Sequence, residues 1–304
     1  MNRTELTLKI LSIPGVGRKS ARLILGKIDA KLNSDRDLVE VLFEIRNYLP
    51  KVKLDAENIQ IGIRITEKIL EDSERNNILL LDTNSPNYPE LLKLIPDAPL
   101  LLSCIGDTTA INRKSVAIVG TRRPSKHAYN VGVRMAEFFA EKGYTVISGL
   151  ALGCDTAAHI GCLNKNGSTV AVLGHGLHTI YPKENIDLAK RIVDNGGVLL
   201  SEYFYGVKPH LSNFIERDRI QAGISQATIV VESGRTGGTL NTVRYSERYN
   251  RPVACYSYPS NMVYGEHNAG NKMLIESNRA IPISNRIDLE NLIKRMNTKV
   301  SSTE

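Results

Sequence analysis

The 304-residue sequence predicts an α/β protein with a doubly wound, mostly parallel sheet, preceded by a small all-α domain. Two observations predict this class. After residue 115, short runs of Val, Ile and Leu alternate with helical segments, and these runs lack the alternating pattern of a strand with one exposed face. Before residue 75, apolar residues such as Leu38, Leu42 and Ile45 recur at helical spacing instead. Right-handed crossovers then place helices on both faces of the sheet.

Three segments are expected along the chain. Residues 1–75 should form the helical domain, of helix-hairpin-helix or SAM-like type. Residues 76–285 should form an extended Rossmann-like domain, and the proline-rich segment 84–107 is interpreted as a connector that packs against it. Residues 286–304 should be a short C-terminal tail with one helical run, and no winged-helix domain is expected.

Six strands are predicted in the Rossmann-like domain, and a loop follows each of them. In an open parallel sheet, ligands bind at the carboxyl ends of the strands, where helix N-termini direct their free amides outward. The loops after the strands are therefore where a site is expected. The six runs are VAIVG, TVISG, TVAVLG, VLLSE, TIVVE and VACYSY, in chain order.

The charge balance favours a polyanionic partner. Lys and Arg number 39 against 32 Asp and Glu, which gives a net charge of +7, although a protein with a merely solvated basic face has the same balance. The four cysteines form no CxxC pair, which indicates buried thiols in a reducing compartment. The sequence shows neither a signal peptide nor an apolar stretch of about 20 residues, so a cytoplasmic protein without membrane contact is expected.

The loop after the first run has residues suited to a phosphate. Gly120 lets the backbone come close, Thr121 follows it, and Arg122 and Arg123 offer planar forks of donors at the start of a helix that Ser125 can cap. The sequence lacks GxGxxG here, so a dinucleotide fingerprint is absent. One arginine could instead pair with a carboxylate and shape the turn.

The loop after the second run, SGLALGCD, is a turn of small residues that leads into a helix. Ser148 and Gly149 are candidates for phosphate contact, and Asp155 is a candidate N-cap. After the third run, His175 and His178 could suggest a metal, but no third or fourth ligand accompanies them. We therefore expect no metal and no cofactor.

Basic and aromatic residues interleave after the fourth run. Asn213, Phe214, Arg217 and Arg219 belong to a segment that should open a helix. Phe214 is the first candidate for stacking on a base, an interaction that contributes ~1–3 kcal/mol. Because Arg217 and Arg219 lie about 200° apart around a helix, one should bind a nucleic-acid backbone and the other should organise the fold.

The loop after the fifth run, ESGRTGGT, looks most like a phosphate cradle. Its candidate residues are Arg235, Gly237, Gly238 and Thr239. No lysine follows the glycines as it does in a P-loop, so nucleotide hydrolysis is disfavoured.

The segment IPGVGRKSAR near the N-terminus resembles a helix-hairpin-helix, whose glycine-rich turn can present backbone amides to one phosphate. Gly15, Gly17, Arg18 and Lys19 are therefore a possible secondary contact with DNA. A hairpin used for packing or for protein contacts is the open alternative.

Eight motifs occur in the order found in DNA-processing proteins of the DprA/Smf family, and the chain is identified as a member over roughly residues 86–283. This resemblance implies a cytosolic bacterial homodimer, joined through the Rossmann-like domain, that binds incoming single-stranded DNA in natural transformation. It also implies that the protein protects this DNA and helps to load the RecA recombinase, and no enzymatic activity is expected. The motifs are YPELL, IPDAPLLLSCIGD, VAIVGTRRPS, SGLALGCDTAAH, TVAVLGHGLHTIYPKEN, LLSEY, NFIERDRIQAGIS and GGTLNTVRYSERYNRPV.

The resemblance also implies where the family's DNA pocket lies in this chain. Three positions depart from the family pattern: Ile215 replaces the usual proline, Asp218 replaces the usual asparagine, and GGTL replaces SGSL. The added carboxylate of Asp218 is expected to weaken the local anion site. The implied pocket residues are Arg122, Asn213, Phe214, Arg217, Arg219, Gly237 and Gly238.

Two other functions stay open as alternatives. A nucleotide phosphoribohydrolase of the lysine-decarboxylase-like LOG type also holds a phosphate on a GG loop. Its PGGxGTxxE pattern needs a proline before the glycines and a glutamate where Arg244 stands, so the match is poor. A domain that senses a nucleotide-derived signal would use the same cleft, and competition by mononucleotides would reveal it.

Overall fold

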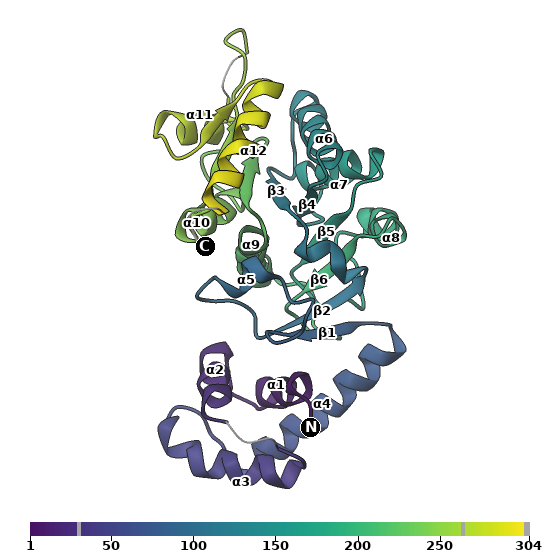
Figure 1. Cartoon of the computed structure of the whole chain (residues 1–304), viewed down its shortest axis with the longest axis vertical. Helices are drawn as coiled ribbons and strands as arrows, with labels where there is room; N and C mark the ends of the chain where they lie inside the picture. Colours follow the sequence, from purple (N-terminus) through teal and green to yellow (C-terminus); the bar gives the residue numbers. More distant parts are fainter. Residues whose placement is uncertain (29–31, 263–264, 301–304) are drawn as a thin grey trace.

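The computed structural model describes residues 1–28, 32–262 and 265–300, and the side chains of 299–300 are left out (Figure 1). Helices α1 to α4 lie at one end of the long axis, next to strand β1, and the α/β part of the chain occupies the rest. Both predicted parts are therefore present. In the described part of the chain, no helix is long and apolar enough to cross a membrane.

The N-terminal part is helical, as the spacing of its apolar residues predicts. Leu38, Leu42 and Ile45 all lie buried on one helix, which starts with a capping box at Ser34. The last helix of this part ends at the predicted boundary, residue 75. The helices are α1 (Arg3–Ser12), α2 (Arg18–Lys27), α3 (Asp35–Ile45) and α4 (Ala56–Arg75), with a short 3-10 turn η1 (Arg46–Tyr48).

The described strands form one sheet in the order β1-β2-β6-β5-β4-β3-β7-β8-β9. Neighbours pair in parallel except β1 with β2 and β2 with β6, so the mostly parallel prediction is confirmed. The six predicted runs are strands β3 to β8. The strands are β1 (Leu79–Asp82), β2 (Leu101–Gly106), β3 (Ser115–Val119), β4 (Thr145–Ser148), β5 (Thr169–Leu173), β6 (Val198–Ser201), β7 (Ala227–Val230), β8 (Val253–Tyr256) and β9 (Ile281–Ile283).

The interpretation of segment 84–107 as a connector is wrong in its second half. Strand β2 lies there, and its first four residues pair with β1 while its last four pair with β6. The first four residues of β2 are buried, so the run LLSC is part of the sheet rather than a covering loop. The proline-rich stretch that precedes β2 ends the short helix α5 (Glu90–Lys93) and leads into the strand.

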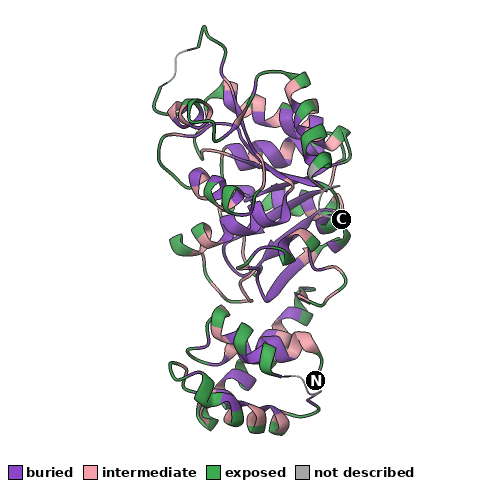
Figure 2. Ribbon diagram, turned by 60° about the vertical axis from the view of Figure 1, so that its left-hand side comes forward, coloured by how far each residue is buried: buried purple, intermediate pink, exposed green. Residues whose placement is uncertain are grey.

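Helices cover both faces of the sheet, which confirms the doubly wound arrangement, and Figure 2 shows the strands buried between them. Helices α6, α7, α8 and α12 pack on one face, and α5, α9, α10 and α11 pack on the other. Their bounds are α6 (Lys126–Glu141), α7 (Cys154–Asn164), α8 (Ile186–Asp194), α9 (Leu211–Ile224), α10 (Thr239–Arg248), α11 (Ala269–Glu276) and α12 (Arg286–Val300), with 3-10 turns η2 (Thr108–Asn112) and η3 (Lys183–Asn185).

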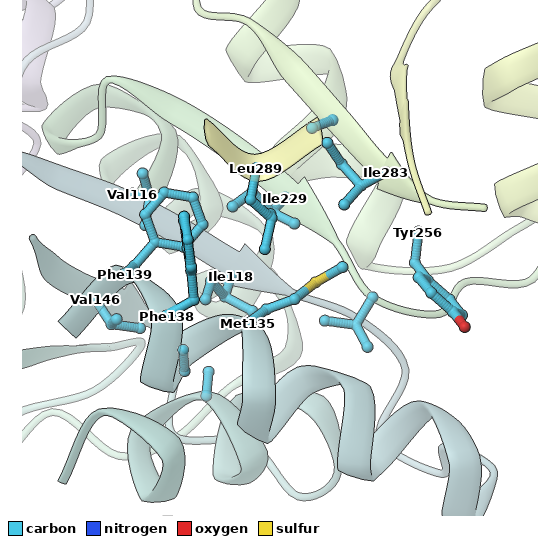
Figure 3. Close-up of a cluster of buried hydrophobic side chains, with 14 of the residues drawn as sticks. Val116, Ile118, Met135, Phe138, Phe139, Val146, Ile229, Tyr256, Ile283 and Leu289 are labelled. Atoms are coloured by element: carbon cyan, nitrogen blue, oxygen red, sulfur yellow. The ribbon is translucent and has the colours of Figure 1, made fainter. Parts of the chain in front are cut away.

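The segment expected to be a C-terminal tail is part of the α/β core. Leu289 and Leu292 of α12 are buried in the same cluster as Phe138 of α6 and Ile229 of β7 (Figure 3). Met296 is buried there too. Residue 285 is therefore not a packing boundary, because the helix that follows it covers β8 and β9.

Candidate nucleic-acid interface

A cavity of about 740 Å³ opens at the carboxyl ends of β3, β4 and β7, the edge at which an open parallel sheet binds its ligands. Loops from four different parts of the chain and two helices, α9 and α10, line it. Most of the predicted site residues meet there. Those that line the cavity are Gly120, Thr121, Arg122, Arg123, Phe214, Arg217, Gly237, Gly238 and Thr239.

The loop after β3 is held from below by a buried glutamate. Glu232 accepts hydrogen bonds from the backbone N–H of Ser125 at 2.8 Å and from its hydroxyl at 2.9 Å. Ser125 also caps α6, since its Oγ accepts from the N–H of Ala128 at 3.1 Å. A Cβ on Gly120 would lie 2.5 Å from the Sγ of Cys154, so only glycine fits this close crossing. The loop backbone is therefore fixed.

Arg122 and Arg123 are exposed at the start of α6, and among the described residues neither forms an ion pair. The open alternative, in which one arginine pairs with a carboxylate to shape the turn, therefore does not hold. The guanidinium carbon of Arg122 lies 5.7 Å from the ring centroid of Phe214. Two planar forks of donors thus face the cavity at a helix N-terminus.

The floor of the cavity holds one buried guanidinium between two buried carboxyl groups. Nη1 of Arg217 donates to the carbonyl of Val172 at 2.5 Å, and its Nε lies 3.3 Å from Oδ1 of Asp218. Asp155 accepts from the N–H of Ala151 at 3.2 Å. Burial raises the pKa of Asp218 to about 7, Arg217 opposes that rise and Asp155 adds to it. Burial also raises the pKa of Asp155.

Phe214 is half-buried on α9 and is the aromatic residue of the cavity wall. Its ring fits over the end of β5 because residue 174 is glycine, where a Cβ would lie 2.7 Å from the ring. The ring centroid lies 5.6 Å from that of Tyr181. Asn213 does not line the cavity, and its side-chain oxygen accepts from the hydroxyl of Ser212 at 3.3 Å.

The glycine-rich loop before α10 forms the opposite wall. Gly237 has a φ of 129°, a conformation that favours glycine, and Gly238 is the N-cap of α10. Both residues are exposed, so their backbone can approach a ligand. Arg235 is exposed on the same loop but does not line the cavity.

Besides Arg217, three of the predicted contact residues are buried. Ser148 is fully buried and donates to the carbonyl of Ile118 at 2.7 Å, which ties β4 to β3. Gly149 lies under Arg217, because a Cβ on it would be 1.8 Å from Nη1 of that guanidinium. Arg219 is 1% exposed and pairs with Glu202, so it organises the fold and is not available to DNA.

Arg18 is half-buried and joins the two domains through ion pairs. Its guanidinium pairs with Glu202 at 3.2 Å and also with Glu216 of α9. Glu202 therefore holds Arg18 and Arg219 together. The other residues of the predicted hairpin contact, Gly15, Gly17 and Lys19, are exposed, and Gly17 is the N-cap of α2.

Some cavity residues were not predicted. Arg244 is exposed on α10, lines the cavity and donates to Asn241. Helical spacing can predict this position of Arg244, because residues 238, 241 and 244 lie near one another on the surface of a helix. Asp155, predicted as an N-cap, lies inside the first turn of α7, and Gly153 is the N-cap. The other unpredicted lining residues include Leu211, Ile215, Asp218, Gln221, Thr242 and His267.

Both histidines after β5 have hydrogen-bond partners within the chain. His175 is buried with Nδ1 at 3.0 Å from the carbonyl of Gly176, while His178 accepts from the N–H of Gly206 at 3.1 Å. Across the described residues, no group of three or more His, Cys, Asp or Glu could hold a metal ion. All four cysteines are free and buried, as predicted.

A family model for DNA recombination-mediator protein A matches residues 79–296, from β1 into α12. The chain belongs to this family. Protein Smf from Synechocystis sp. is 40% identical over 199 residues, which are 64% of this chain and 49% of that protein. Smf of Escherichia coli is 35% identical, with 67% of this chain and 56% of that protein covered. The chain therefore spans about half the length of these two curated relatives.

Solved structures extend the likeness to the helical domain. The X-ray structure of DNA processing protein A (DprA) from Streptococcus pneumoniae matches with a TM-score of 0.75 and 27% identity over 96% of this chain and 98% of that one. DprA from Helicobacter pylori, whose structure was described for its single-stranded DNA binding mode, matches with a TM-score of 0.62 and 27% identity over 74% and 96%. The predicted DprA/Smf membership is confirmed, and it supports a role in DNA processing.

Proposed function

We propose that this chain binds single-stranded DNA, without sequence specificity, in the cavity at the carboxyl edge of the sheet. The observation that carries the proposal is the pair of exposed guanidiniums of Arg122 and Arg123 at the N-terminus of α6, free of ion pairs in the described structure. Arg122 also lies next to Phe214. Guanidiniums that track the phosphates and an aromatic face that stacks on a base are the parts of a non-specific single-strand site. The H. pylori relative described for its single-stranded DNA binding supports the same conclusion.

Two kinds of contact, with phosphates and with bases, contribute to the affinity of the proposed site for DNA. Each neutralised phosphate of a single strand contributes about −0.7 to the slope of log affinity against log salt, so a site with about four phosphate contacts loses roughly fiftyfold in affinity for a fourfold rise in salt. Stacking on Phe214 contributes ~1–3 kcal/mol and depends little on salt. The two contributions can therefore be separated by measurement.

A fluorescence anisotropy titration with labelled oligothymidylate across a salt series tests the proposal. Arg122→Ala should weaken binding and lower the salt slope by about 0.7. Phe214→Ala should weaken binding by ~1–3 kcal/mol and leave the slope unchanged. Arg36→Ala, an exposed arginine on α3 that pairs with Glu40, is the matched control and should change neither. Equal affinities and slopes for all four proteins would refute the site, and displacement by mononucleotides would indicate a small-molecule ligand.

We infer further that binding serves recombination during natural transformation: the chain, as a cytoplasmic homodimer joined through the Rossmann-like domain, protects incoming single strands and helps RecA to load on them, with no chemistry of its own. Membership of a recombination-mediator family supports this inference. RecA-dependent strand exchange on DNA precoated with single-strand-binding protein should be accelerated by the wild type and not by Arg122→Ala. Light scattering that finds only monomers would contradict the homodimer.

A further inference from the structure

A second and smaller cavity of about 60 Å³ adjoins the main one. It shares Arg122, Phe214 and Arg217 with the main cavity, while Tyr181 and Pro182 form its far side. We call this smaller cavity the Tyr181 slot. Phe214 lines both cavities. A DNA strand that leaves the main cavity past Phe214 would therefore enter the slot.

Tyr181 is a large aromatic side chain with 46% of its surface exposed. Its ring lies 5.6 Å from that of Phe214, with 30° between the ring planes, which is within the usual range for neighbouring aromatic rings. Leu152, another lining residue of the slot, is 40% exposed. A tyrosine that packs in the hydrophobic core is buried, whereas Tyr181 and Leu152 expose apolar surface to solvent at the edge of the slot.

The loop that carries Tyr181 is held on both sides. Before it, the N–H of Gly176 donates to the carbonyl of Val207 at 2.8 Å. After it, the buried side chain of Asn185 donates to the carbonyl of Leu150 at 2.8 Å. An exposed ring on a fixed backbone loses little freedom when a flat ligand packs on it, so the loop is preorganised for stacking.

We propose that Tyr181 is a second stacking platform for a nucleobase, next to Phe214. The inference rests on the proposed function and adds a subsite to it. Successive aromatic faces for bases beside a guanidinium for the phosphate fit an unpaired strand, whatever its sequence. Arg122 lines both cavities and so serves the phosphate between the two stacked bases. The strand then passes from the main cavity over the loop between β5 and η3.

The test compares Tyr181→Ala, Tyr181→Phe and a control, Tyr48→Ala, in anisotropy titrations with a long oligothymidylate. Loss of one stacking platform should lower affinity roughly 5- to 150-fold, the equivalent of ~1–3 kcal/mol, without changing the salt slope. Phenylalanine keeps the aromatic face, so Tyr181→Phe should bind within about twofold of the wild type. Tyr48 is 68% exposed on the N-terminal domain, and its removal should have no effect on binding.

The outcomes separate this inference from the proposed function. If Tyr181→Ala binds like the wild type while Arg122→Ala and Phe214→Ala bind weakly, the second platform is refuted and the site stands. If Tyr181→Phe is as weak as the alanine variant, the aromatic face is not what binds, and stacking is refuted. If none of the three alanine variants changes binding, the proposed function itself fails.

Discussion

Replacing Asp218 by asparagine removes a buried carboxyl group from the floor of the cavity. Burial raises the pKa of this group to about 7, from an ordinary value near 4 in the unfolded chain. Between these two values the folded protein keeps a proton that the unfolded chain has lost. The free energy of unfolding therefore falls as the pH rises from about 4 to about 7, and above pH 7 the contribution stays constant.

The size of the effect follows from the same two values. Each pH unit in that window changes the free energy of unfolding by about 1.4 kcal/mol, so the wild type should lose roughly 2–3 kcal/mol between pH 5 and pH 7 from this group alone. Asparagine has nearly the same shape and does not titrate. The stabilities of wild type and Asp218→Asn should therefore be similar near pH 5 and diverge above it, with the variant more stable.

Urea unfolding followed by circular dichroism at pH 5, 6, 7 and 8 measures this difference, since the chain has no tryptophan for fluorescence. The exposed Glu40→Gln on α3 is the control and should follow the wild type at every pH. Anisotropy titrations add a second readout, because a carboxylate that ionises beside Arg217 should weaken phosphate binding above pH 7 in the wild type only. A constant stability difference between wild type and Asp218→Asn from pH 5 to pH 8 would refute the reasoning.

Three further predictions concern the support of the site. Glu202→Gln leaves the guanidinium of Arg219 buried without its main carboxylate, so urea unfolding should show a loss of ~3 kcal/mol. Gly149→Ala would place a methyl group 1.8 Å from Nη1 of Arg217, so anisotropy should show weaker oligothymidylate binding. Burial raises the pKa of all four cysteine thiols, so mass spectrometry should find maleimide labelling only after denaturation.

Each of these has its own control. Glu40→Gln breaks an exposed ion pair on α3, which is worth less than ~1 kcal/mol, and a loss equal to that of Glu202→Gln would contradict the importance of burial. Gly143→Ala replaces an exposed glycine in the turn after α6 and should leave DNA binding unchanged; equal binding by Gly149→Ala would contradict the close packing at that position. Rapid labelling of the native protein would contradict thiol burial.

The sequence predicts the central sheet well because strands buried on both faces have an unambiguous apolar pattern, as in Ser115–Val119 and Thr169–Leu173. Strand β2 is missed for two reasons. It pairs antiparallel with β1 and with β6, and β6 is distant from it in the sequence. Prolines also precede it, and they suggest a loop. The C-terminal helix is found, but its burial depends on contacts with β8 and β9 that no local pattern shows.

The candidate site is predicted loop by loop, and its errors come from tertiary partners. Spacing shows that Arg217 and Arg219 cannot serve one contact, but it cannot tell that Glu202 removes Arg219 from the surface. Nor can spacing show that the same carboxylate pairs with Arg18 of the N-terminal domain. The position of Arg122 at the cavity follows from local sequence, because the loop that carries it lies between the end of β3 and the capped start of α6.

The ion pairs of Glu202 limit how freely the helical domain could be exchanged between relatives. This carboxylate is shared by a cation from α2 and one from α9, the helix that also carries Phe214. A chimaera in which residues 1–75 come from another member must supply a cation at position 18, or Glu202 and Glu216 lose a common counterion. Exchanging the first domain therefore also changes the ion pairs beside α9, the helix that carries Phe214.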